Sequence, residues 1–114
     1  MAFFTYIVAS RRNGTLYTGS TDGLYVRTLQ HREGTFRGFT KRHGVAMLVW
    51  FEKHPTREAA FIRERRIKEW KRPWKLELIE RANPGWRDLF ADLEAGHGRQ
   101  AKDWTPPSDD PAAP

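Results

Sequence analysis

The chain has 114 residues, of which 39% are hydrophobic, and this is enough apolar material for one modest core in a single domain. Its formal net charge of +6 favours a polyanionic partner, and its lack of cysteine excludes disulfides and thiolate metal sites. No segment has the roughly 18 consecutive apolar residues of a membrane span, and the first residues lack the pattern of a secretory leader. We therefore expect a cytoplasmic protein with no membrane partner.

Two short runs rich in aromatic and β-branched residues predict a β-hairpin at the start of the chain. They cover residues 3–8 and 16–18, and an Asn-Gly pair lies between them. Asn-Gly favours a type I′ turn because both residues tolerate a positive φ. With a turn at this position, Tyr6 and Tyr17 lie on neighbouring antiparallel strands, and their side chains can point the same way.

A short helix is predicted over residues 24–32, after a turn that contains a plausible N-cap. Leu24, Arg27 and His31 are separated by steps of three and four residues, so they share one face of this helix. That face presents an apolar residue followed by two groups that can carry a positive charge.

Residues 34–44 are predicted to form a glycine-rich loop that could bind the phosphate backbone of a nucleic acid. Its basic and imidazole side chains are Arg37, Lys41, Arg42 and His43. Phe36 and Phe39 are interleaved with them and can stack on bases.

Residues 45–51 are apolar on both alternations and predict the most buried strand, placed centrally in a three-stranded sheet. A longer helix is predicted next, from an N-cap at Thr56 to about residue 70 or 71. Its predicted inward stripe consists of Ala60, Ile67 and Trp70. Glu64 lies between members of this stripe, so we expect its carboxylate on the inward side of the helix.

Two further helices are predicted over residues 74–81 and 86–93, the second of them amphipathic. Beyond residue 96 the composition changes to Gly, Pro, Asp, Ala and Ser without periodicity, which is typical of a disordered tail. The predicted architecture is therefore an α+β domain over residues 1–95, with a three-stranded antiparallel sheet flanked by helices, and a disordered tail over residues 96–114.

An ordered series of motifs runs from about residue 3 to residue 93. It consists of Tyr6, Tyr17-Thr18-Gly19, Arg27, His31, the segment 38–42, the segment 60–64 with Lys68 and Trp70, and Asn83-Pro84 with Trp86. In this order and spacing the chain resembles the GIY-YIG nuclease superfamily, and in particular its small stand-alone bacterial members. The first signature triplet departs from Gly-Ile-Tyr and reads Phe4-Thr5-Tyr6, and the second reads Tyr-Thr-Gly in place of Tyr-Ile-Gly.

The resemblance implies a metal-dependent endonuclease that hydrolyses phosphodiester bonds in DNA, with branched, flapped or single-stranded DNA as candidate substrates. It implies Glu64 as the ligand of Mg²⁺ or Mn²⁺, since one carboxylate with several waters is a normal way to hold such an ion. The implied catalytic residues are Tyr6, Tyr17, Arg27, His31 and Asn83. Gly19 is implied as a position where the backbone comes close to a neighbouring strand or to substrate. Arg27 suits the charge of the phosphoryl transition state because its guanidinium forks onto phosphate oxygens.

Each of these residues also has a simpler interpretation. Glu64 can be a helix glutamate paired with Lys68 at i+4, and Arg27 can be a solvated helix arginine. The tyrosines can be packed strand residues with wet hydroxyls, His31 can be structural, and Asn83 before a proline can be a turn residue.

A dense basic set on the long helix and just after it predicts a nucleic-acid track, flanked by Trp70 and Trp74. Its members are Arg63, Arg65, Arg66, Lys68, Lys71, Arg72 and Lys75. In most proteins such a set is only a solvated surface. The competing functions are a non-catalytic nucleic-acid-binding module or accessory subunit that retains the nuclease fold, and a basic domain that binds an unidentified protein partner.

Overall fold

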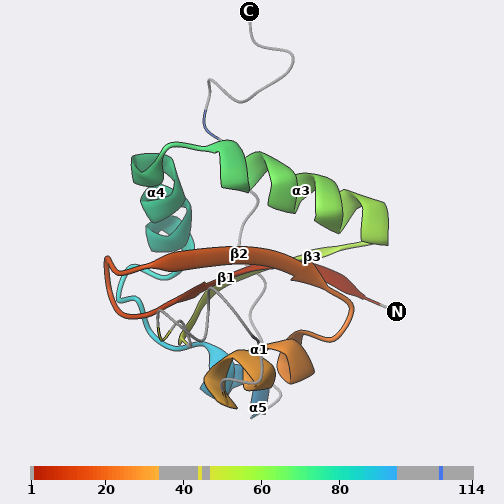
Figure 1. Ribbon diagram of the computed structural model, residues 1–114, viewed down its shortest axis with the longest axis horizontal. Coiled ribbons are helices and arrows are strands. Elements are labelled where there is room, and N and C mark those ends of the chain that lie inside the picture. The colour runs from red at the N-terminus through yellow and green to blue at the C-terminus, as the bar shows by residue number, and fades with distance from the viewer. Residues whose placement is uncertain (1, 34–43, 45–46, 95–105, 107–114) are drawn as a thin grey trace, which may run out of the picture.

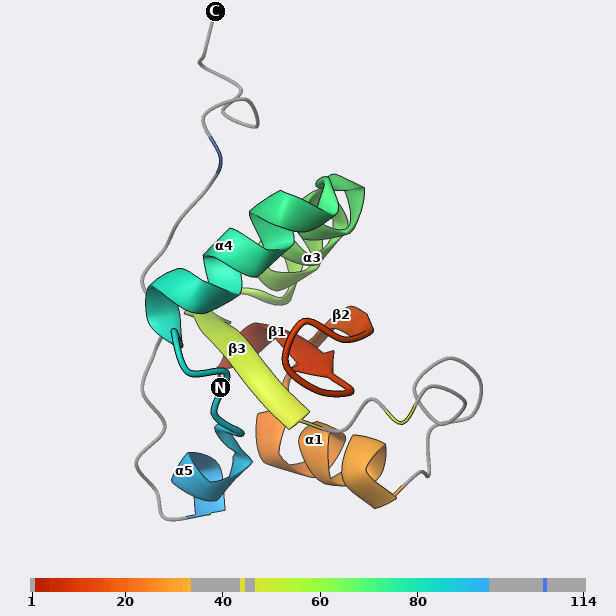
Figure 2. The ribbon, with the colours of Figure 1, turned by 90° about the vertical axis from the view of Figure 1, so that its left-hand side faces the viewer.

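The structure is a computed structural model that describes residues 2–33, 44, 47–94 and 106. Its strands are β1 (Phe3–Ala9), β2 (Leu16–Thr21) and β3 (Met47–His54), and they form an antiparallel sheet in the order β2-β1-β3. Its helices are α1 (Leu24–Glu33), α3 (Arg57–Glu69), α4 (Arg72–Ala82) and α5 (Phe90–Glu94). Helices α3 and α4 cover one face of the sheet, and α1 and α5 lie against the other (Figures 1 and 2). This confirms the predicted α+β fold.

The predicted hairpin is confirmed, but its turn is not of type I′. Ala9 pairs with Leu16, so residues 10–15 form a longer loop than the two residues of a type I′ hairpin. Within this loop Asn13 alone has a positive φ, of 58°, and the amide of Gly14 donates to the carbonyl of Arg11 at 2.9 Å. The asparagine therefore supplies the left-handed residue that the turn needs.

The central strand is β1, and the prediction that the apolar strand is central was wrong. Among the strands of the described residues, β3 pairs only with β1, through pairs such as Trp50 with Ile7. It is nevertheless buried, because the chain after α4 covers its outer edge: Asn83 Nδ2 donates to the Val49 carbonyl at 3.1 Å and the Leu89 amide donates to the Leu48 carbonyl at 2.7 Å. An apolar run on both alternations therefore reflects covered faces and a covered edge, not a central position.

Two apolar clusters fill the two faces of the sheet. The cluster under α3 and α4 is built around Ile7, Val49, Trp50, Ile67, Trp70, Leu78, Ile79 and Trp86. The cluster under α1 consists of Tyr6, Val8, Leu24, Leu48 and Phe51. Tyr6 thus belongs to the core on the α1 face. The predicted inward stripe of α3 is confirmed, as is its N-cap, where Thr56 Oγ1 accepts from the Ala59 amide at 3.1 Å.

Arg63 lies on the buried side of α3, which corrects its prediction as part of the outer basic set. It is three residues after Ala60 and four before Ile67, so it follows the apolar stripe. Its guanidinium donates to both carboxylate oxygens of Glu52 on β3, at 3.1 and 3.4 Å, and the two side chains are only 9% and 4% exposed. Trp70 is also buried in the core, so its ring does not form part of a nucleic-acid surface.

The last predicted helix begins later than expected, at Phe90 in place of residue 86. Trp86 has a φ of 54°, which a right-handed helix does not accommodate, and its indole donates to Glu80 at 2.9 Å. Asp88 then accepts from the Phe90 amide at 3.0 Å and starts α5. The predicted helices over residues 24–32 and 74–81 are confirmed as α1 and α4.

Several predictions fall outside the described part of the chain. They are the basic loop with Arg37, Lys41, Arg42 and His43, and the tail over residues 96–114 apart from Pro106. Among the described helices, none combines the length and apolarity that crossing a bilayer requires.

Candidate active site

Strand β2 is an edge strand, and its outer edge lies between α1 on one side and α3 on the other (Figure 1). Because side chains alternate along a strand, Tyr17 and Gly19 face the α1 side and Ser20 faces the α3 side. Groups from both helices can therefore reach the same strand edge from opposite faces of the sheet.

The two predicted tyrosines and His31 pack together on the α1 side. Tyr6 Oη and His31 Nε2 are 3.0 Å apart in a buried hydrogen bond. The ring centroid of Tyr17 lies 6.4 Å from that of Tyr6 and 5.3 Å from that of His31. Tyr6 and His31 are buried and Tyr17 is half-buried, so Tyr17 is the tyrosine of this group that retains solvent access.

Gly19 makes room for the ring of Tyr6, which is its partner across the hairpin. A Cβ atom at Gly19 would lie 2.6 Å from Tyr6 Oη and 2.8 Å from Cζ, closer than such atoms can approach. The close approach predicted at Gly19 is therefore that of the Tyr6 ring to the β2 backbone.

Burial determines the protonation of the Tyr6–His31 pair. It raises the pKa of Tyr6 well above the usual range for tyrosine; Tyr17 and Glu64 raise the pKa further, and Arg27 partly opposes the shift. Burial, followed by the nearby Arg27 charge, lowers the pKa of His31 to about 4. At neutral pH the phenol therefore keeps its proton and is hydrogen-bonded to a neutral imidazole. His31 does not supply the cation that the sequence pattern allowed.

Glu64 reaches the β2 edge from α3 with both carboxylate oxygens engaged. Oε1 accepts from Ser20 Oγ at 2.6 Å, and Oε2 lies 2.7 Å from Lys68 Nζ. The glutamate side chain is 12% exposed, so it does not point into bulk solvent. The Lys68 ammonium also lies 5.7 Å from the centroid of the Tyr17 ring, on the other face of the strand. Glu64 therefore pairs with Lys68 at i+4, as the simpler interpretation expects, and it also lies at the β2 edge.

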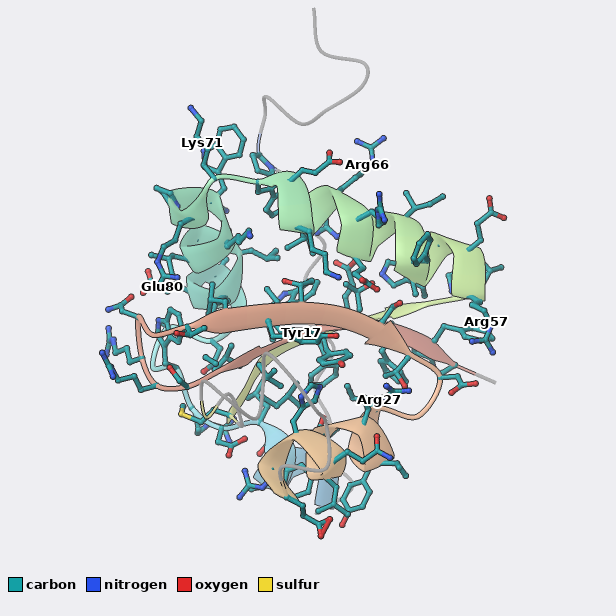
Figure 3. The ribbon with its side chains drawn as sticks, viewed as in Figure 1. Tyr17, Arg27, Arg57, Arg66, Lys71 and Glu80 are labelled. Atoms are coloured by element: carbon teal, nitrogen blue, oxygen red, sulfur yellow. The ribbon has the colours of Figure 1, made fainter. Side chains whose placement is uncertain are left out.

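Arg27 completes the group of charges around this edge. It is half-buried on α1 and lies on the side of that helix facing the sheet, below Tyr17 in the view of Figure 3. Its charge acts on both Tyr6 and His31, as their pKa shifts indicate. The edge of β2 therefore carries a half-exposed phenol, a carboxylate and two cations, Arg27 and Lys68.

Asn83 is not brought to this edge, in contrast to its predicted catalytic place. Its amide nitrogen donates to the carbonyls of Val49 and Arg87 at 3.1 and 2.8 Å, and its oxygen accepts from the Arg87 amide at 3.0 Å. Val49 belongs to β3, which is on the opposite edge of the sheet from β2. All of these bonds brace the turn after α4 against β3, which is the turn role that an asparagine before proline suggested.

The comparisons with known proteins identify the family. The model of the GIY-YIG catalytic domain matches residues 2–77. The chain belongs to the GIY-YIG family. This confirms the resemblance seen in the sequence. Its two signature triplets are adjacent in the hairpin, where Tyr6 pairs with Gly19. The atypical Phe4 packs edge-on against Phe51, with 6.2 Å between the ring centroids.

Similar relatives come from staphylococci. UPF0213 protein SERP0126 of Staphylococcus epidermidis is 35% identical over 77 residues, which is 68% of this chain and 93% of that protein. UPF0213 protein SSP2268 of Staphylococcus saprophyticus is 36% identical over 76 residues, covering 67% and 92%. The solution NMR structure of the UPF0213 protein BH0048 from Bacillus halodurans matches 78% of this chain and 94% of that one, with 26% identity and a TM-score of 0.49.

The side chains at the β2 edge of this GIY-YIG domain fit a divalent metal ion that has one protein ligand. Within the described ranges, no three His, Cys, Asp or Glu side chains gather as a potential metal site. Glu64 is the carboxylate that the β2 edge offers. Mg²⁺ is commonly bound by one or two carboxylates together with waters and substrate phosphates, and a single oxygen-ligand residue suits that mode.

Ser20 is a site residue that the sequence analysis missed. It belongs to one rung of the sheet, Ser20–Thr5–Glu52, whose three side chains all contact α3. Thr5 Oγ1 donates to the Ala60 carbonyl at 2.8 Å, Glu52 pairs with Arg63, and Ser20 donates to Glu64. This rung fixes the rotation of α3 about its axis. The alternation of side chains along β2 places Ser20 on the opposite face of the sheet from Tyr17. Its partner, Glu64, is known only from the packing of α3 on the sheet.

Proposed function

We propose that this protein is a divalent-metal-dependent endonuclease that hydrolyses phosphodiester bonds in DNA. Membership in the GIY-YIG family supports a nuclease. The observation that carries the proposal is the convergence at the β2 edge, where Glu64 of α3 is 12% exposed and lies beside Lys68, whose ammonium is 5.7 Å from the Tyr17 ring. Phosphodiester hydrolysis needs an activated water and neutralisation of the phosphate charge, and a carboxylate, a phenol and cations around one open edge can supply both.

Glu64 is the residue that would hold Mg²⁺ or Mn²⁺. Such an ion, when bound, supplies charge neutralisation at the phosphate and a water of lowered pKa. The Lys68 ammonium forms an ion pair with Glu64 Oε2 at 2.7 Å, so it competes with a metal ion for the same oxygen. Ser20 holds the other oxygen in place.

Arg27 stabilises the negative charge that develops on the phosphate, because its guanidinium is permanently charged and can bind two oxygens at once. Tyr17 orients the attacking water, since it is the half-exposed tyrosine of the group. Tyr6 keeps its proton and is hydrogen-bonded to neutral His31, so this pair positions Tyr17 and does not accept the proton of the water.

A comparison of three proteins tests the proposal: the wild type, Glu64→Gln and the control Glu69→Gln. Glu69 is exposed at the end of the same helix. Each protein is incubated with linear, flapped and four-way DNA and with RNA, with Mg²⁺, Mn²⁺ or chelator. The proposal expects metal-dependent cleavage by the wild type and the control, and none by Glu64→Gln. Retarded DNA without product in every reaction would instead support the non-catalytic binding module.

A further inference from the structure

A cavity of about 490 Å³, open to solvent, lies on the surface where the β1–β2 loop meets the first turn of α4. Its walls are Ser10, Arg11 and residues 13–16 from the hairpin, together with Arg72 and Lys75 from the helix. Residues 13–16 end at Leu16, the residue before Tyr17, so the cavity adjoins the candidate active site along β2.

The lining of this cavity is cationic. It includes Arg11, Arg72 and Lys75, and no carboxylate is among the described residues that line it. Burial lowers the pKa of Lys75, and the neighbouring charges of Arg72 and Lys68 lower it further. Arg72 therefore repels Lys75, which is half-buried, and an anion bound beside them would relieve that repulsion.

The cavity is preformed by bonds across its walls. Arg72 Nη2 donates to the carbonyls of Asn13 and Gly14 at 2.8 and 2.6 Å, which ties α4 to the hairpin loop. Across the loop, the Thr15 amide donates to Ser10 Oγ at 3.0 Å. A preformed site loses little conformational entropy when it binds its ligand.

The cavity lies close to the β2 edge along the same strand. Leu16 lines the cavity and Ser20 contacts Glu64, and four strand residues span about 13 Å. Lys68 touches both places: its ammonium pairs with Glu64, and its carbonyl accepts from Lys75 Nζ at 3.4 Å. Successive phosphates of one strand in a duplex are about 3.4 Å apart along the axis, so a single strand can occupy both places.

We propose that this cavity binds a backbone phosphate of the same nucleic-acid strand, a few phosphates away from the one held at the β2 edge. The inference rests on the proposed function, because it names how that site holds its substrate. It predicts binding that depends on phosphate and not on base identity.

The test compares the double variant Arg11→Gln/Lys75→Gln with the control Lys53→Gln, which removes an exposed charge on β3. Arg72 is left intact because it ties the loop to α4. Binding of a labelled DNA duplex is measured by fluorescence anisotropy in chelator over a range of salt concentrations, so no cleavage intervenes. We expect the double variant to bind about tenfold more weakly near 0.1 M salt and to lose about one to two units of salt slope. We expect the control to change neither quantity by as much.

Two outcomes would overturn the inference. One is that the double variant matches Lys53→Gln in both affinity and salt slope. The other is that the double variant loses binding of inorganic phosphate, measured by calorimetry, while its DNA affinity stays the same, which would assign the cavity to free phosphate. Thermal unfolding of both variants shows that the fold is kept. Failure of the nuclease proposal has a different readout, the absence of cleavage by the wild type with metal.

Discussion

The hydroxyl of Ser20 donates a hydrogen bond of 2.6 Å to Glu64 Oε1 and so joins the edge strand β2 to helix α3. The two residues are 44 positions apart in the chain. The same glutamate pairs through its other oxygen with Lys68, so its carboxylate is oriented from two sides. The geometry of the candidate metal ligand therefore depends on how a helix packs on a strand.

Replacing Ser20 by alanine removes one of the two groups that orient Glu64. Partners of a ligating side chain are typically worth 10–100-fold in metal affinity or activity. We expect Ser20→Ala to need roughly tenfold more Mg²⁺ for half-maximal cleavage, with most of the maximal rate kept at saturating metal. Ser20→Thr keeps the hydroxyl and should behave like the wild type. Equal metal dependence in the alanine and threonine variants would contradict the positioning role.

Replacing Lys68 by methionine frees Glu64 Oε2 from its ammonium partner. Ion pairs of this exposure contribute about 0.2–1 kcal/mol, so we expect Mn²⁺ to bind the protein alone up to about fivefold more tightly. Calorimetry without nucleic acid measures the Mn²⁺ affinity. Lys53→Met is the matched control, because it also removes one lysine charge but lies on β3, at the opposite edge of the sheet from Glu64. Tighter binding in both variants would mean that net charge, and not competition at Glu64, controls the affinity.

Gly19→Ala forces the Tyr6 ring out of its place, because the new Cβ would lie 2.6 Å from Tyr6 Oη. Overpacking a buried position typically costs about 1–3 kcal/mol, and we expect a loss of unfolding free energy in this range. Urea unfolding measures it. In a Tyr6→Leu background the alanine should cost clearly less, and purely additive effects would show that the ring is not what Gly19 accommodates.

The neutral state of His31 makes stability fall in mild acid. Its pKa is lowered from 6.5 to about 4 in the folded protein, so the unfolded chain binds more protons between these pH values. This contribution is complete above pH 6.5 and is lost as the pH falls from 6.5 to 4. We expect the unfolding free energy of the wild type to drop by up to about 3 kcal/mol more than that of His31→Asn over this range. Parallel pH profiles for the two proteins, from urea unfolding, would refute it.

The buried pair of Arg63 and Glu52 holds the middle of α3 on the sheet. Arg63→Met removes the guanidinium from the buried Glu52 carboxylate, whose Oε1 also lies 3.0 Å from His54 Nε2. Because a buried carboxylate then loses its permanently charged partner, we expect a cost of about 3–5 kcal/mol of unfolding free energy. The double variant Arg63→Met/Glu52→Leu should regain most of this loss, because the buried carboxylate is then removed together with the guanidinium. Denaturant unfolding of the three proteins measures both effects. A double variant no more stable than Arg63→Met would argue against the pairing.

Local patterns in the sequence predicted most of the helices and strands. The Asn-Gly pair marked the hairpin, Thr56 marked the start of α3, and steps of three and four residues placed Leu24, Arg27 and His31 on one face of α1. These features depend on neighbours within a few positions, where backbone geometry alone decides which side chains lie together. The family match over residues 2–77 covers the predicted motifs from Tyr6 to Trp70, and Asn83 and Trp86 lie beyond it.

Only the packed structure decided the strand order, the burial of Arg63 and the placement of Asn83 against β3. It also decided that His31 is neutral and that Ser20 orients Glu64. Each of these depends on contacts between segments far apart in the chain, and the pKa shift of His31 depends on how completely water is removed from around it. A single sequence specifies its helices and strands through near neighbours, but burial and charge pairing are properties of the surfaces that those elements cover when they meet.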